Sequence, residues 1–150
     1  MPKKVRPIPK EYHAVTPSLT QEDAGKTIAF CKQAFGAKER MRITGPNAKI
    51  MHAEIQIGDS IVMLTDAVHS PAQPAGLFLY VIDVDKTFAK AVKAGAKTVM
   101  PPQDMFWGDR FGSVEDPYGN HWAIATHIED VPPREMKKRA AKAMAQPGNT

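Results

Sequence analysis

The sequence contains very little cysteine and no long hydrophobic run. Cys31 is the single cysteine in 150 residues, which excludes an internal disulfide framework and favours a reducing compartment. No apolar run approaches the length that crosses a bilayer, and the basic start MPKKVRPIPK leads into no apolar stretch of a secretory signal. We therefore expect a cytoplasmic protein of one domain, residues 1–150, with no membrane partner.

The sequence also lacks most motifs that mark an enzyme. It has no Gly-rich phosphate loop, no Cys-x-x-Cys pair and no nucleophile elbow, so it predicts no cofactor. Asp83 and Asp85 resemble a carboxylate pair, but Asp83 directly precedes a predicted helix. Capping of that helix explains Asp83 better than catalysis does.

Positive charge is concentrated at the two ends of the chain. The formal net charge is +4, but residues 1–10 hold four basic and no acidic side chains, and residues 131–150 hold five basic and one acidic. The body between them has 11 basic and 15 acidic side chains, and so a net charge of −4. We expect solvated basic ends rather than a nucleic-acid-binding protein.

The chain repeats itself at a nearly fixed spacing. Lys26 and Thr27 recur at Lys86 and Thr87, 60 residues later, and the triplet Gly-Ala-Lys at 36–38 recurs at 95–97. Self-similarity of this kind indicates a repeated structural unit.

Each repeat has the same predicted order of elements. Apolar residues at helical spacing predict helices at 22–35 and 84–94, each preceded by a strand, at 12–19 and 76–83. Three β-like runs follow each helix, at 38–44, 50–57 and 60–66, and at 97–102, 110–115 and 121–127. The pattern is βαβββ twice, an α+β fold. It predicts module one at about 12–66, a linker at 67–75, module two at about 76–131 and a basic tail at 132–150, part of which can form an amphipathic helix.

Several stretches resemble a known family. FCKQAFGAKE, HAEIQIGDSIVML, LYVIDVDKTFAKAVKAGA, FWGDRFGSVEDPYGNHWAIATH and IEDV look like the vicinal oxygen chelate superfamily, in the PhnB-like part of its glyoxalase/bleomycin-resistance branch. The resemblance covers about 12–131. It implies two βαβββ modules that form a cupped mixed or antiparallel sheet around a cleft, with helices outside, and it implies a homodimer.

The resemblance also implies where a metal would bind. Metalloenzymes of the superfamily take His or Glu ligands from the first and last strands of each module, which places them here at Thr16 and Gly76 and, by an offset of 61, at Val62 and Ala123. None of these residues offers a carboxylate or an imidazole, and a divalent ion needs three or four such donors. We therefore expect no metal at the usual site.

A displaced metal site has one candidate pair. His52 and Glu54 alternate with apolar neighbours and so share one face of a strand, where they can chelate or simply face water. If Gly58-Asp59 is a plain turn, both turn away from the face of Val62, and a bulge would reverse this.

Aromatic residues mark the other candidate site. Phe106, Trp107 and Phe111 surround a Gly-Asp turn next to Arg110, which fits a planar or anionic ligand, or alternatively a hairpin in which Arg110 pairs with Asp109. The predicted ligand-binding residues, some at the cleft mouth, are Thr16, His52, Glu54, Phe78, Tyr80, Trp107, Arg110 and His121. His127 is also a candidate for the mouth, although an ordinary exposed histidine explains it equally well.

Two functions compete on this basis. The first is a small-molecule binding protein of the glyoxalase/bleomycin-resistance type that holds a small organic ligand without the usual metal. The alternative is a lyase, isomerase or dioxygenase of the superfamily with a displaced divalent metal. Polyanion binding by the tails is a third, weaker hypothesis.

Overall fold

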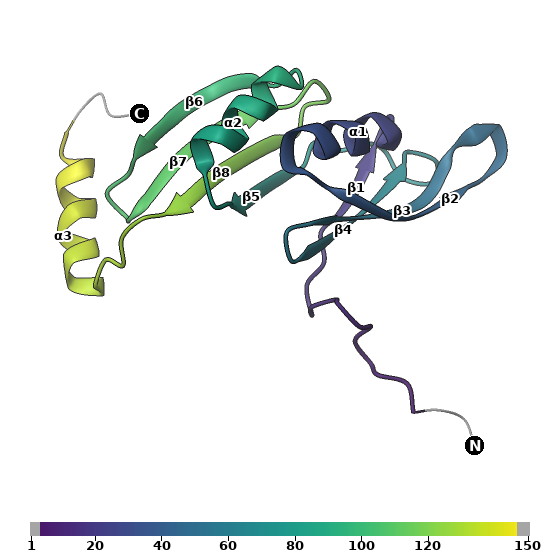
Figure 1. The fold of residues 1–150 in the computed structure, drawn as a ribbon, viewed down its shortest axis with the longest axis horizontal. Coiled ribbons are helices and arrows are strands. Elements are labelled where there is room, and N and C mark those ends of the chain that lie inside the picture. The colour runs from purple at the N-terminus through teal and green to yellow at the C-terminus, as the bar shows by residue number, and fades with distance from the viewer. Residues whose placement is uncertain (1–3, 147–150) are drawn as a thin grey trace.

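The structure is a computed structural model that describes residues 4–146, which form two successive βαβββ modules and a C-terminal helix (Figure 1). Module one consists of β1 (Ser18–Gln21), α1 (Ala24–Phe35), β2 (Lys38–Thr44), a short 3-10 turn (Pro46–Ala48), β3 (Ile50–Ile57) and β4 (Ser60–Asp66). Module two consists of β5 (Gly76–Tyr80), α2 (Val84–Lys93), β6 (Lys97–Asp104), β7 (Asp109–Glu115) and β8 (His121–His127), and α3 (Pro133–Met144) follows. The predicted α+β fold of tandem modules is confirmed.

The strands form two separate four-stranded sheets with equivalent topology. Their orders are β1-β4-β3-β2 and β5-β8-β7-β6. In each sheet the first strand runs parallel to the last strand of its module and the other pairs are antiparallel, so both sheets are mixed. α1 and α2 lie beside each other and each covers one face of its own sheet (Figure 1). We call the opposite face of each sheet its helix-free face.

The first strand begins later than the sequence predicts. The prediction was 12–19, whereas β1 is Ser18–Gln21. Pro17 has no amide hydrogen to donate, and only its carbonyl oxygen takes part, as acceptor from Met63 N at 2.9 Å. The segment before it leaves the body of the molecule (Figure 1).

Local capping residues set the ends of both main helices. Asp23 Oδ1 accepts a hydrogen bond from Lys26 N at 3.1 Å, and Asp83 Oδ1 accepts one from Lys86 N at 3.2 Å, so Asp83 is a helix cap as predicted. Gly36 ends α1 in the left-handed conformation at φ 66°, which a residue with a side chain adopts only at a cost.

The hydrophobic core lies between each helix and its sheet. Ile28 of α1 packs in the same buried cluster as Leu64, and Val84 of α2 in the same cluster as Trp122 and Ile124. Cys31 also belongs to this core, and burial raises the pKa of its thiol to about 12, so it is a packing residue as predicted. None of the described helices is long and apolar enough to cross a membrane.

A buried polar network joins the two modules. Asn120 Nδ2 donates to Gln21 Oε1 at 2.7 Å, and Gln21 Nε2 donates back to Asn120 Oδ1 at 3.1 Å. Asn120 also donates to Asp116 Oδ2, which accepts a second hydrogen bond from Trp122 Nε1. Because these side chains are almost fully buried, the network fixes how module one sits against module two.

The last strands of the two modules correspond at an offset of 60 residues. Asp66 Oδ1 accepts a hydrogen bond from Ala24 N at 2.7 Å, and Thr126 Oγ1 accepts one from Val84 N at 2.8 Å. Each side chain thus receives the first amide of its module's helix, and both pairs are 60 residues apart. The offset of 61 that the sequence suggested for these strands is wrong.

This correction changes which residues share a face. Val62 belongs to the core under α1, and the residue of β4 that corresponds to Ala123 is Met63. The sequence misleads here because β3 and β4 are joined by the two-residue turn 58–59, whereas β7 and β8 are joined by the five-residue loop 116–120. Matching the glycines of these two connections shifts the register by one residue, and one residue reverses the face.

Candidate functional site

The helix-free face of the second sheet has small residues along its middle and aromatic residues on both sides. β8 contributes Ala123 and Ala125 to this face, β5 contributes Phe78 and Tyr80, and β7 contributes Phe111. β5 and β7 lie on either side of β8, about 9 to 10 Å apart. The rings of Phe78 and Phe111 nevertheless approach to 5.7 Å between centroids, because they lean across the alanines, which are 9% and 0% exposed.

Five aromatic rings form a continuous row on this face. Phe78 lies 5.1 Å from Tyr80, Phe111 lies 5.7 Å from Trp107, and Trp107 lies 5.2 Å from Phe106, all between ring centroids. We call Tyr80, Phe78, Phe111, Trp107 and Phe106 the aromatic row. The rings are tilted or edge-on to one another, with interplanar angles between 37° and 89°, which are favourable geometries for aromatic pairs.

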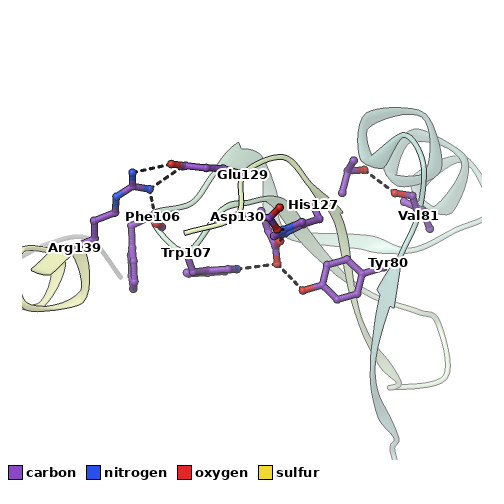
Figure 2. A network of polar contacts seen from close by, with 10 residues as sticks. Tyr80, Val81, Phe106, Trp107, His127, Glu129, Asp130 and Arg139 are labelled. Atoms are coloured by element: carbon purple, nitrogen blue, oxygen red, sulfur yellow. Dashed lines mark hydrogen bonds and ion pairs between the residues drawn. The ribbon is translucent and has the colours of Figure 1, made fainter. Parts of the chain in front are cut away.

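A buried carboxylate connects two members of the aromatic row. Asp109 Oδ2 accepts hydrogen bonds from Tyr80 Oη at 2.8 Å and from Trp107 Nε1 at 3.0 Å (Figure 2). Burial opposes ionisation of Asp109, which is 2% exposed, but the hydrogen bonds that it accepts outweigh burial and lower its pKa. The same contact raises the pKa of Tyr80, so the phenol stays a donor. Asp109 therefore fixes the orientation of two rings.

His127 completes this cluster from the neighbouring strand. Its Nδ1 lies 2.8 Å from Asp109 Oδ1 and its Nε2 lies 2.7 Å from Asp130 Oδ1. The hydrogen bonds to Asp109 and then Asp130 raise the pKa of His127, which favours the imidazolium, with both nitrogens donating. The sequence did not indicate this pairing, because Asp109 and His127 become partners only through the register of β7 and β8.

A cavity of about 1040 Å³ lies next to the aromatic row, between the two modules. Its walls are mainly apolar, and the larger apolar side chains that line it are Phe35, Ile57, Ile61, Val62, Leu77, Leu79, Val81 and Trp122. Tyr80, Phe78 and His127 line it as well, so the cavity and the aromatic row share residues. Of the predicted ligand-binding residues, Thr16, Phe78 and Tyr80 lie in the cavity wall.

The structure separates two predicted site residues that are close in sequence. Trp107 belongs to the aromatic row, whereas Arg110 points to the side of α2, where its guanidinium binds Asp85 at 2.8 Å and Asp104 at 3.1 Å. This ion pair lowers the pKa of Asp85. Asp109 and Arg110 point to opposite faces because they are neighbours in a strand, so the predicted meeting of Trp107 and Arg110 over one ligand does not occur.

The remaining predicted residues lie outside the cavity. β3 and β4 are joined by a plain two-residue turn, with Glu54 opposite Met63, so Glu54 and His52 do face away from Val62. They lie on the helix-free face of the first sheet, where His52 Nε2 is 3.2 Å from Glu54 Oε2. His121 is exposed at the start of β8.

The fold and this site have counterparts among known proteins. Residues 13–124 match the profile of the Glyoxalase/Bleomycin resistance protein/Dioxygenase superfamily. The chain belongs to this superfamily. An uncharacterized protein of Mycobacterium tuberculosis is 38% identical over 130 residues, which cover 79% of this chain and 76% of that protein.

Solved structures of the superfamily fold are also similar to the chain. TioX from Micromonospora sp. superposes with a TM-score of 0.67 at 26% identity, over 77% of this chain and 99% of TioX. The PhnB protein from Bacillus cereus has a TM-score of 0.63 at 17% identity, over 76% of this chain and 99% of PhnB, which shows a shared fold.

The metal ligands of the superfamily's metalloenzymes have no counterpart here. With the offset corrected, the implied positions are Thr16, Gly76, Met63 and Ala123, which offer no carboxylate and no imidazole. Within residues 4–146, no three His, Cys, Asp or Glu side chains gather closely enough to hold a metal ion. The residues present therefore do not fit the metal of the superfamily.

Proposed function

We propose that this superfamily member is a metal-independent binding protein for a small planar organic ligand. The ligand occupies the cavity between the modules and stacks on the aromatic row. The observation that carries this proposal is the aromatic row itself, five adjoining rings from three separate segments of module two.

The exposure of these rings supports a binding role. Phe78 is 50% exposed and Tyr80 is 64% exposed, although both lie on a regular strand whose other face is packed. Contiguous aromatic surface of this kind is unusual on a protein without a binding partner. An apolar cavity with a few polar groups at its rim, here Tyr80 and His127, has the usual character of a small-molecule site.

The hydrogen bonds of Asp109 support the same function. A ring that must be ordered when a ligand binds costs conformational entropy, and Tyr80 and Trp107 are already held in place by the carboxylate. Asp109 itself is 2% exposed and its oxygens are occupied, so we assign it to positioning these rings.

The alternative, a superfamily enzyme with a displaced metal, depends on His52 and Glu54. These two side chains bond to each other, and no third donor joins them among the described residues. Two ligands do not hold a divalent ion tightly. We therefore do not propose metal catalysis.

We further propose that the protein is a homodimer. β5 pairs on one side only, with β8, and so presents a free strand edge. Ile82, just beyond that edge, is 98% exposed, and Phe78 and Tyr80 of β5 are at least half exposed. An apolar edge strand of this kind favours pairing with another chain. Sedimentation velocity tests this proposal, and a protein that is only monomeric at micromolar concentration would contradict it.

Fluorescence titration with two planar probes, anionic 1-anilinonaphthalene-8-sulfonate and cationic proflavine, tests the binding function. We expect saturable binding of at least one probe by the intact protein. Trp107→Ala removes stacking surface worth about 0.5–1.5 kcal/mol, which corresponds to about a twofold to twelvefold loss of affinity.

Tyr118→Ala is the matched control, because Tyr118 is 40% exposed and does not belong to the aromatic row. We expect it to bind the probes as the wild type does. If neither probe binds, or if Trp107→Ala and Tyr118→Ala bind equally well, the proposed site is wrong. If only a duplex oligonucleotide binds at physiological salt, the basic ends carry the activity instead.

A further inference from the structure

The turn that carries Phe106 and Trp107 is held against the segment that follows β8. Met105 N donates to Asp109 O at 2.8 Å and Gly108 N to Met105 O at 3.2 Å, which closes the turn. Gly108 O accepts the backbone amides of Ile128 and Glu129, at 2.8 and 3.0 Å. A side chain at position 108, where φ is 102°, would collide with the carbonyl of Glu129.

A single arginine of the C-terminal helix binds both partners of this contact. Arg139 Nη1 donates to the carbonyl oxygen of Phe106 at 3.1 Å and to Glu129 Oε1 at 2.8 Å, and Arg139 Nη2 donates to Glu129 Oε2 at 2.9 Å (Figure 2). Nε donates to Glu135 at 3.2 Å within α3. The planar guanidinium matches this set of acceptors, which a lysine ammonium cannot reproduce.

The contacts of Arg139 lead step by step to the aromatic row. Arg139 holds the carbonyl of Phe106, the next residue is Trp107, and the indole of Trp107 donates to Asp109, which also receives Tyr80 (Figure 2). The basic tail was expected to be a solvated end, but α3 is anchored at the end of the second sheet by this arginine. The neighbouring bases Lys137 and Lys138 are exposed.

We infer that Arg139 is a positioning residue for ligand binding, because it holds the turn that presents Trp107, and that α3 is therefore part of the binding site. This inference rests on the proposed function. Arg139 does not touch the ligand in this scheme. It determines how much of the time Trp107 lies in the aromatic row, in the position that Asp109 and Phe111 define.

The size of the expected effect follows from exposure. The Arg139 side chain is 31% exposed and that of Glu129 is 48% exposed, so water weakens their interaction. The contact between Gly108 and Glu129 also remains when Arg139 is replaced. We therefore expect Arg139→Gln to weaken binding of the better of the two planar probes about threefold, and at most about tenfold.

Two further variants separate positioning from charge. Arg139→Lys keeps the positive charge beside Glu129 but loses the fork that reaches the Phe106 carbonyl, so we expect an intermediate affinity. Lys138→Gln removes a charge from the same helix at an exposed position and should bind the probe as the wild type does. Equal affinities of wild type and Arg139→Gln, or equal losses in Arg139→Gln and Lys138→Gln, would overturn the inference.

Fluorine NMR of protein labelled with 5-fluorotryptophan reports on the position of Trp107 without any ligand. The chain has two tryptophans, and Trp122 is fully buried in the core, so its resonance controls for the fold. Trp107→Phe assigns the two signals. We expect Arg139→Gln to shift or broaden the Trp107 resonance and to leave the Trp122 resonance unchanged.

The NMR result also distinguishes failure of this inference from failure of the proposed function. An identical Trp107 resonance in wild type and Arg139→Gln overturns the positioning role, whatever the probes do. If the resonance shifts but the wild type binds neither probe, Arg139 does position Trp107 and the proposed binding function is wrong. A change in the Trp122 resonance means that Arg139 acts on the whole fold, which also overturns the inference.

Discussion

Replacement of Asn120 by alanine tests whether the buried polar network determines how the two modules fit together. The Asn120 side chain makes four hydrogen bonds: it donates to Gln21 Oε1 at 2.7 Å and to Asp116 Oδ2 at 2.9 Å, and it accepts from Gln21 Nε2 at 3.1 Å and from Ala75 N at 2.9 Å. Asn120 itself is 0% exposed, so water does not compete for these bonds in the folded protein.

The partners of Asn120 determine the size of the loss. A hydrogen bond between neutral groups contributes about 1 kcal/mol net, so four lost bonds would cost about 4 kcal/mol. Gln21 keeps other partners, Thr27 Oγ1 for its oxygen and the carbonyls of Thr20 and Gln73 for its nitrogen, whereas Ala75 N loses its acceptor. We therefore expect Asn120→Ala to lower the free energy of unfolding by about 2–4 kcal/mol, a large part of a typical 5–15 kcal/mol.

Urea unfolding followed by circular dichroism measures this loss, with Ser60→Ala as the control. Ser60 lies 60 residues before Asn120, at the corresponding position of module one, but it is exposed and bonds only to the neighbouring Asp59. Its replacement should change the unfolding free energy by less than about 0.5 kcal/mol. If Asn120→Ala costs less than about 1 kcal/mol, or no more than Ser60→Ala, the network does not hold the modules together.

Three further predictions follow from other contacts. The carboxylates of Asp109 and Asp130 raise the pKa of His127, so its stabilisation is complete below the ordinary value of about 6.5 and is lost as pH rises through the raised pKa; urea midpoints at pH 6–9 should fall less steeply in His127→Gln than in wild type, and equal slopes would contradict this. Arg110→Ala should leave probe affinity unchanged in the fluorescence titration, because Arg110 points to the side of α2, and a loss equal to that of Trp107→Ala would refute that placement. Cys31 should react with Ellman's reagent at pH 8 only after unfolding, because its pKa is about 12 in the buried site, and rapid reaction of the native protein would show that it is accessible.

Most of the fold was predictable from the sequence because its signals are local. The helical spacing of apolar residues, Gly36 at the end of the first helix and Asp83 at the start of the second depend only on neighbours in the chain. The recurrence of Lys26-Thr27 at residues 86–87 indicated the repeat, since both copies form the same turn of a helix.

The strand offset was not predictable to the residue. It depends on the lengths of two connections, 58–59 and 116–120, and both contain a glycine that invites alignment. An error of one residue placed Val62 on the wrong face, because side chains alternate along a strand.

Only part of the candidate site could be recognised in the sequence. Phe78, Tyr80 and Trp107 were visible as aromatic residues near turns and strand ends. The roles of Asp109 and His127 were not visible, because their contact crosses two strands and 18 residues of chain. The role of Arg139 was hidden for the same reason, since its partner Phe106 is 33 residues away.

The sequence by itself determined the elements of this protein, their order and their duplication, because those properties follow from local periodicity, capping and turn residues. The tertiary structure decided which face each side chain occupies and which distant groups share hydrogen bonds. Those outcomes depend on strand register and on the packing of one module against the other. The Trp107–Asp109–Tyr80 cluster illustrates the difference: all three residues can be read in the chain, but only the sheet brings two of them to a single carboxylate oxygen.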